Sequence, residues 1–212
     1  VEVKVNRQVI DPQRDALQAV EAGSGYYQVQ WQASEVNPGL GKIEINNPQP
    51  GPTWGAMYWQ YFEDLDKIKG AETPLSLHKA FFKVENTPQG PELIPITEQD
   101  PLEVGDRIRV RVEIRVDRAM SYVHFKDLRG AGLEPVDALS GYQYQNGLGY
   151  YRSIRDASMN YFFERLPQGT WTLEYDLRAN LAGDFSNGIA SLQCFYAPEY
   201  SSHSTGDRIV IR

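Results

Sequence analysis

The chain has 212 residues, of which 41% are hydrophobic and 23% charged, so collagen-like, coiled-coil and disordered classes are excluded. Its net charge of −7 argues against binding to a nucleic-acid backbone, which requires a basic face. The sequence has no run of about 18 apolar residues, so we expect no membrane span.

Aromatic residues are abundant, with 13 Tyr, 8 Phe and 4 Trp, and such residues favour β-strands. The chain begins on an alternating pattern, VEVKV, and ends on a similar one at residues 208–211. We therefore expect a piece of a longer protein. Residues 11–22 are predicted to form a short helix, with Asp11 as its N-cap and Pro12 in its first turn. Short strands are predicted around Tyr27 to Trp31, at Ile43 to Ile45 and over residues 54–62.

The polar stretch KIKGAETP at residues 67–74 is predicted to separate two regions that are rich in strands. We expect a smaller β-domain over residues 1–72 and an antiparallel β-sandwich over residues 73–212. The sandwich strands are predicted at residues 75–84, 107–117, 123–128, 171–177 and 190–196. Turn signals such as Asn146-Gly147 separate the strands. About a dozen short strands in all predict an all-β fold.

Residues 107–117 give the strongest strand pattern, because apolar and charged residues alternate strictly. The apolar positions are Ile108, Val110, Val112, Ile114 and Val116. The arginines on the other face could bind an anionic partner. We favour instead a solvated face that protects a sheet edge from pairing.

The common motifs of catalytic, nucleotide-binding and metal sites are absent from the sequence. His78, His124 and His203 are far apart in the sequence and are predicted to be packed or exposed rings. A hydrolase with a spatial triad around His124 stays open as an alternative. The single cysteine, Cys194, is predicted to be a buried thiol. We expect no catalytic residue and no cofactor.

Three carboxylates, Glu63, Asp64 and Asp66, follow the aromatic residues 54–62. They could bind calcium, which takes six to eight oxygen ligands. They lack the glycine and the ligand spacing of a calcium loop. We therefore interpret them as surface residues and expect no metal.

Two groups of aromatic residues are candidates for an interaction surface. They are Trp54, Tyr58, Trp59 and Tyr61 in one group, and Tyr142, Tyr144, Tyr150 and Tyr151 in the other. One hypothesis is a platform on which sugars stack. The favoured hypothesis is a contact between domains together with a core ring pair, since aromatic residues are frequent in interfaces and cores.

Several segments strongly resemble the C-terminal end of bacterial alpha-2-macroglobulins. They are WGAMYWQYFED at residues 54–64, GYYRSIRDAS at 149–158, LPQGT at 166–170, EYDLRA at 174–179, GDF at 183–185 and FYAPE at 195–199. The resemblance implies the returning half of a CUB-like β-domain followed by the last macroglobulin domain. Cys194 precedes Phe195 and Tyr196, not the Glu-Gln pair of the family's thioester motif, so no catalytic residue is carried over.

The resemblance also implies a function and a location. The family entraps attacking proteases in the bacterial cell envelope, in the periplasm or at the surface, and many members are lipid-anchored. This chain would be a non-catalytic structural module that relays conformational change and contacts the other domains of its parent chain. The smaller β-domain would lack partner strands, so its apolar face would be covered by residues 75–212 or by a second copy, as in a dimer. The alternative is a carbohydrate- or protein-binding sandwich of the envelope.

Overall fold

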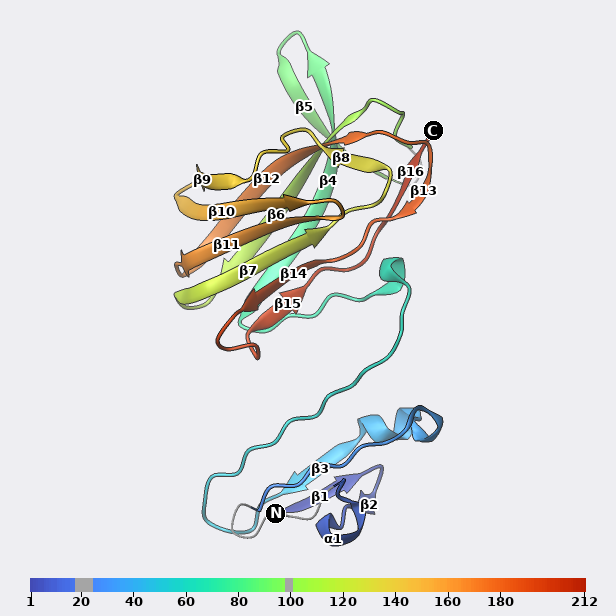
Figure 1. Ribbon diagram of the computed structural model, residues 1–212, viewed down its shortest axis with the longest axis vertical. Coiled ribbons are helices and arrows are strands. Elements are labelled where there is room, and N and C mark those ends of the chain that lie inside the picture. The colour runs from blue at the N-terminus through green and yellow to red at the C-terminus, as the bar shows by residue number, and fades with distance from the viewer. Residues whose placement is uncertain (18–24, 98–100) are drawn as a thin grey trace. The chain divides into compact units, whose positions relative to one another are not determined.

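The computed structural model describes residues 1–17, 25–97 and 101–212. The chain divides into two compact units, residues 1–60 and 61–212. The second unit consists mainly of strands, the first contains one small sheet, and all the named strand pairs are antiparallel (Figure 1). This confirms the prediction of an all-β fold. None of the helices in the described ranges has the length and apolar character that crossing a bilayer requires.

The first unit contains one small sheet with the strand order β2-β1-β3. Its strands are β1 (Glu2–Val5), β2 (Gln8–Val9) and β3 (Ile43–Asn46), and two 3-10 turns, η1 (Ala33–Glu35) and η2 (Pro38–Gly41), precede β3. The predicted strand at Ile43 is therefore confirmed. The predicted strand around Tyr27 is wrong, because residues 25–32 have no regular secondary structure.

The predicted helix begins where expected but is much shorter. In α1 (Pro12–Asp15) the Asp11 side chain accepts a hydrogen bond from the backbone N–H of Gln13, as an N-cap does. Ala16 is already extended, and the N–H of Leu17 donates to the carbonyl of Gln28 at 2.8 Å. This bond draws the chain away from the helix. The remaining predicted helical residues, 18–22, lie outside the described residues.

Residues 54–62 contain no strand, contrary to the prediction. A strand requires a hydrogen-bonded neighbour, and a run of aromatic side chains does not supply one. Residues 52–64 have neither helix nor strand, and the short turn η3 (Leu65–Lys67) follows them.

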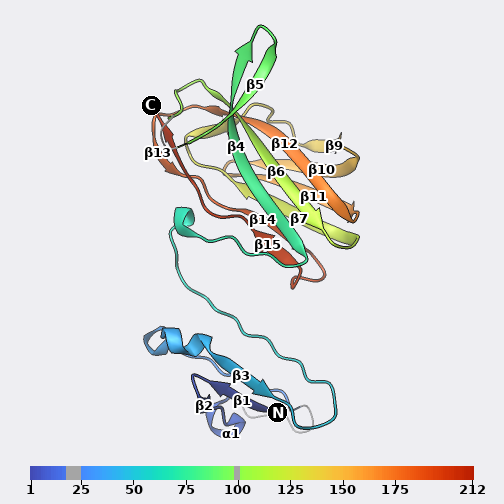
Figure 2. The same ribbon diagram turned by 180° about the vertical axis from the view of Figure 1, so that it is seen from behind.

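The second unit has two large sheets that face each other, and Figures 1 and 2 show them from opposite sides. The five-stranded sheet has the order β5-β4-β6-β12-β8, and the six-stranded sheet the order β15-β14-β7-β11-β10-β9. The first consists of β4 (Leu75–Thr87), β5 (Gly90–Pro95), β6 (Arg107–Val116), β8 (Leu133–Pro135) and β12 (Gly169–Ala179). The second consists of β7 (Met120–Leu128), β9 (Gly141–Gln145), β10 (Leu148–Arg155), β11 (Ser158–Leu166), β14 (Ala190–Cys194) and β15 (Ser201–His203). A further pair is formed by β13 (Gly183–Ser186) and β16 (Arg208–Ile211).

Alternation along the strands builds the core between these two sheets. All five apolar residues predicted to face inward on β6 are 2% exposed or less. Strands β7 and β12 follow the same pattern, with Phe125 and Leu173 completely buried. The predicted pattern over residues 190–196 holds only as far as Cys194, where β14 ends; Tyr196 lies in the following turn and is 79% exposed.

The hairpin of β9 and β10 closes one side of the sandwich. Its turn is Asn146-Gly147, with φ of 51° and 86°, and this confirms the turn expected from the sequence. Strand β8 pairs with only the last residues of β12. Nearer the beginning of β12, the side-chain amide of Gln145 accepts from the backbone N–H of Glu174 at 3.3 Å and donates to its carbonyl at 3.4 Å. Asn146 donates to the Thr172 carbonyl at 3.0 Å. Side chains thus replace a missing strand at this edge.

Two adjacent phenylalanines on β11 test the register of the six-stranded sheet. Phe163 is 1% exposed and belongs to the core, whereas Phe162 is 40% exposed on the outer face. Phe163→Ala is expected to lower the free energy of unfolding by about 3–5 kcal/mol, because it leaves a cavity. Phe162→Ala, the matched control, should cost about 1 kcal/mol or less. Urea unfolding followed by circular dichroism measures both values, and equal costs would contradict the register.

Candidate functional site

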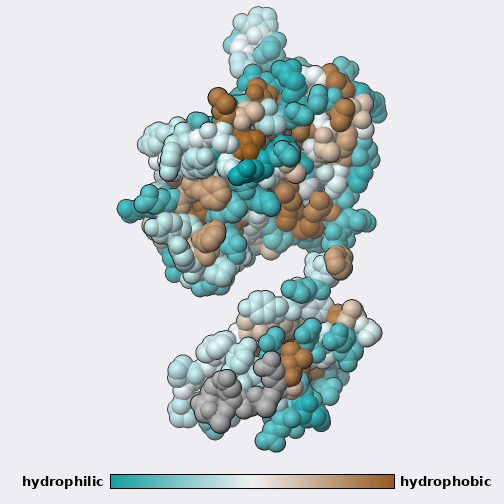
Figure 3. All heavy atoms as spheres, in the orientation of Figure 1, coloured by the Kyte–Doolittle hydropathy of each residue, from teal (hydrophilic) through white to brown (hydrophobic). Residues whose placement is uncertain are grey.

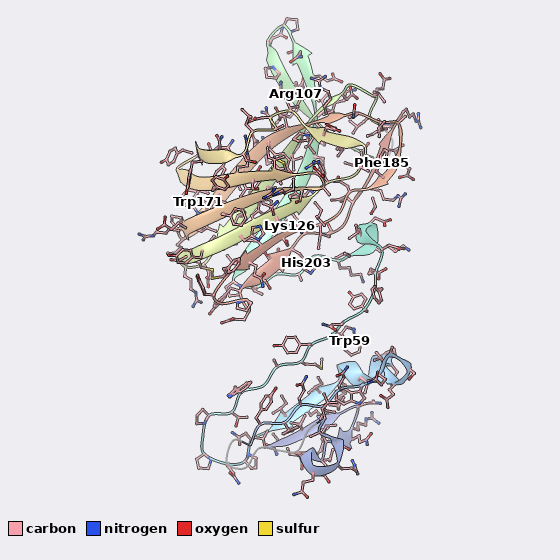
Figure 4. The ribbon with its side chains drawn as sticks, in the orientation of Figure 1. Trp59, Arg107, Lys126, Trp171, Phe185 and His203 are labelled. Atoms are coloured by element: carbon pink, nitrogen blue, oxygen red, sulfur yellow. The ribbon has the colours of Figure 1, made fainter. Side chains whose placement is uncertain are left out.

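The aromatic residues predicted to form an interaction surface divide between the two units. In the first unit and the segment that follows it, Trp54, Tyr58, Trp59 and Tyr61 are all exposed, by 79, 85, 46 and 69% respectively. The ring of Trp54 stacks on that of Tyr26, with the centroids 5.9 Å apart. These side chains lie on an extended segment of the chain, not on a strand. Figure 4 labels Trp59 on this segment.

The second aromatic group lies on the hairpin of β9 and β10. Tyr142, Tyr144 and Tyr151 are exposed, whereas Tyr150 is only 7% exposed. The Tyr150 ring lies 5.2 Å from Tyr161 and 5.5 Å from that of Phe163. Tyr150 is therefore a core residue, because it occupies an inward position of β10, and the other three remain available for contact.

A row of rings runs straight across the outer face of the six-stranded sheet. Tyr142 pairs with Tyr151, Tyr151 with Phe162, and Phe162 with His124, so β9, β10, β11 and β7 each contribute one residue. At one end of the row, the rings of Tyr142 and Tyr151 are 5.1 Å apart, edge to face. His124 and Phe162 stack in parallel at 4.5 Å. We call these four residues the aromatic row. Sequence analysis did not assign Phe162 or His124 to it, although both occupy outward positions on their strands.

Next to the aromatic row is a shallow hollow of about 350 Å³ on β7, β14 and β15. It is lined by His124, Lys126, Gln193 and His203, among others. Figure 4 labels Lys126 and His203 on this part of the unit, and Figure 3 shows hydrophobic and hydrophilic residues interspersed on the face turned to the viewer. Nε2 of His124 hydrogen-bonds the side-chain amide of Asn160 at 3.0 Å. An amide can orient a histidine in a catalytic triad, but no hydrogen bond among the described residues joins His124 to a serine, threonine or cysteine side chain that could serve as nucleophile.

The arginines of β6 pair with carboxylates on the neighbouring strand. Arg107 and Arg109 both donate to Asp176 of β12, each through Nε at 2.8 Å, and Arg111 donates to Glu174 at 2.6 Å. The interpretation of this face as protection of a sheet edge is wrong, because β6 lies between β4 and β12. A second hollow of about 350 Å³ is lined by three arginines and three carboxylates, which neutralise one another.

Three charged and polar side chains meet in the core between the sheets. Nζ of Lys79 on β4 lies 2.5 Å from Oδ1 of Asp127 on β7, and these side chains are 2% and 0% exposed. The hydroxyl of Tyr175 on β12 donates to the other carboxylate oxygen. We call these three residues the buried triad. Sequence analysis missed it, although a lysine in phase with the inward Leu75 and Leu77 was a usable signal.

The remaining candidates have structural partners. Asp64 forms an ion pair with Lys67, and Asp66 one with Arg208. Among the residues that the structure describes, no group of three or more His, Cys, Asp or Glu side chains could hold a metal ion. Cys194 is 7% exposed, which confirms the predicted buried thiol.

The fold and these surfaces can be compared with known proteins. A family model described as the bacterial alpha-2-macroglobulin MG10 domain matches residues 75–199, more than half of the chain. This chain belongs to that family. The MG10 match covers most of the two large sheets, including the aromatic row and all three members of the buried triad. No curated protein gives a significant match.

Solved alpha-2-macroglobulins share the fold of about two thirds of this chain. A mutant of the Salmonella protein is 17% identical, with a TM-score of 0.54, and the match covers 68% of this chain and 10% of that one. The Escherichia coli protein activated by porcine elastase is 19% identical, with a TM-score of 0.56, and the match covers 68% of this chain and 14% of that one. A native E. coli structure that runs from domain MG7 to the C-terminus is 15% identical, with a TM-score of 0.54, and the match covers 68% of this chain and 24% of that one. This chain thus spans only a small part of these proteins.

The ion pairs on the outer face of the five-stranded sheet predict that the stability of the fold decreases in acid. Burial raises the pKa of Asp176, but hydrogen bonds from Arg109 and Arg107 outweigh this effect and hold the pKa below its ordinary value. A carboxyl group with a lowered folded-state pKa stabilises the fold above its unfolded pKa of about 3.9, and this stability is lost as the pH falls through the folded value.

Asp176→Asn should therefore lower the free energy of unfolding by about 1–2 kcal/mol at neutral pH. The difference from the unsubstituted chain should shrink as the pH falls below about 3.9, the unfolded pKa, and through the lower folded pKa. Urea unfolding over this pH range measures it, with the exposed Asp156→Asn as control. A difference that stays constant or grows in acid would contradict the role given to Asp176.

Proposed function

We propose that this chain is a non-catalytic structural module of an alpha-2-macroglobulin-like protein that traps proteases. The observation that carries the proposal is the MG10 match over residues 75–199, on a chain that spans 10 to 24% of the similar solved proteins. We propose that residues 1–72 correspond to the returning half of a CUB-like domain and residues 73–212 to the MG10 sandwich. The parent protein would act in the bacterial cell envelope, in the periplasm or at the surface.

The aromatic row is our candidate for the surface that contacts a neighbouring domain. Exposed aromatic rings are enriched where proteins meet. The parallel stacking of His124 on Phe162 covers one face of each ring with the other ring. A sugar platform needs an exposed ring face, and this stacking removes one face of each ring, so we favour a protein partner over a carbohydrate.

The mechanism we propose is a rearrangement of domain contacts. Cleavage elsewhere in the parent protein would change which domain covers the aromatic row, and the rigid sandwich would pass this change on without altering its own packing. The exposed rings of residues 54–62 would likewise be covered by a neighbouring domain or by a second copy. Sedimentation of the chain distinguishes a dimer from a monomer and so tests the second copy.

The chain alone is expected to inhibit no protease, because a relay module has nothing to relay outside its parent protein. Trypsin and elastase activity on a large protein substrate, with and without an excess of the 212-residue chain, measures this. Inhibition that survives heat denaturation of the chain would indicate only competition by a cleavable substrate. Inhibition lost on denaturation would contradict the proposal.

In the longer gene product, the double variant Tyr151→Ser and Phe162→Ser should change the response to a protease. With two rings of the aromatic row removed, the shape change after elastase treatment, measured by small-angle scattering, should be reduced or occur before cleavage. The matched control is Arg155→Ser with Glu164→Ser, which changes exposed polar residues of the same two strands. Identical behaviour of the two double variants would contradict a contact through this face.

A further inference from the structure

The buried triad combines an amine and a carboxyl group in contact with each other inside the core. Lys79 reaches from the five-stranded sheet and Asp127 from the six-stranded sheet, so the pair joins the two layers. The amine also contacts the Leu128 carbonyl at 3.3 Å and lies 4.8 Å from the centre of the Phe81 ring. Removing two charges from water carries a large desolvation cost. A neutral product of the two groups would avoid this cost.

We propose that Lys79 and Asp127 condense spontaneously to an amide, which cross-links the two sheets of the sandwich. The carboxyl carbon of Asp127 is bonded to the oxygen that Nζ already touches, so nucleophile and electrophile are neighbours. Holding two reacting groups together raises their effective concentration to roughly 10⁵–10⁸ M in favourable cases. Both side chains are almost completely buried, so little water is available to reverse the reaction.

The reaction needs no reagent beyond the two side chains. The ammonium group first gives a proton to the carboxylate, which converts the ion pair into an amine and a carboxylic acid. The nitrogen lone pair then attacks the carboxyl carbon and forms the N–C bond. One further proton moves from nitrogen to the departing hydroxyl, the C–O bond breaks, and one water leaves. The product is a neutral secondary amide.

Two neighbouring groups have the properties that these proton transfers need. Burial raises the pKa of Tyr175 well above its ordinary value, so its hydroxyl stays protonated and can polarise the carboxyl group to which it donates. Asp207 precedes β16 and is close enough to interact electrostatically with Lys79 and Asp127. Burial raises the pKa of Asp207, although the charges of Lys79 and His78 act in the opposite direction. This carboxyl group can take the proton from nitrogen and pass it to the leaving oxygen.

A second ion pair provides an internal comparison. Nζ of Lys83, on the same strand, lies 2.9 Å from Asp106, but these side chains are 29% and 18% exposed. Both lysines therefore contact a carboxylate, and the two pairs differ in that only Lys79 and Asp127 are buried in the core. We expect no condensation at Lys83.

The experiment is an intact mass measurement of the purified chain. The unsubstituted 212-residue chain should have a mass one water below the value calculated from its sequence. A protease digest should give the peptides of Lys79 and Asp127 joined together. Lys83→Met should still lose one water relative to its own sequence, whereas Lys79→Met should have its full mass. An unsubstituted chain of full mass, with the two peptides separate, would overturn the proposal, whether or not the variants fold. A water loss that persists in Lys79→Met would overturn it as well.

Discussion

The larger unit depends on one constraint, which is that every second side chain of its strands faces an interior closed on both sides. Two sheets packed face to face leave about 10 Å between them, and this space must be filled with apolar side chains or with polar groups that satisfy one another. The five apolar residues of β6 fulfil the first condition. Lys79, Asp127 and Tyr175 fulfil the second, since none of the three could be buried alone without a large energetic cost.

The same constraint explains which features could be predicted from the sequence. Strict alternation identified β6 and β12 and their inward residues, and the Asn146-Gly147 turn was evident from two residue types. Alternation gives the face of a strand but not its neighbour. It therefore could not show that β6 is a central strand, or that residues 54–62 have no strand beside them. The pairing of Lys79 with Asp127, 48 residues apart, depends on the same long-range information.

Membership of the bacterial alpha-2-macroglobulin MG10 family and the surface of the sandwich lead to one view of its function. The arginines that could have formed an anion-binding face are neutralised by Asp176 and Glu174. His124 is held by an amide and by a phenyl ring, not by a nucleophile. The aromatic row is an exposed surface of a composition frequent in interfaces, and our proposal is that it contacts a neighbouring domain.

The most direct measurement is hydroxyl-radical footprinting of the aromatic row in two settings, the isolated chain and the longer parent protein that we propose. Labelling of Tyr142, Tyr151 and Phe162 should be strong in the isolated chain and several-fold weaker in the longer protein, while that of the buried Tyr161 should be low in both. Equal labelling of the row in the two settings would show that no domain covers it, and would contradict the account.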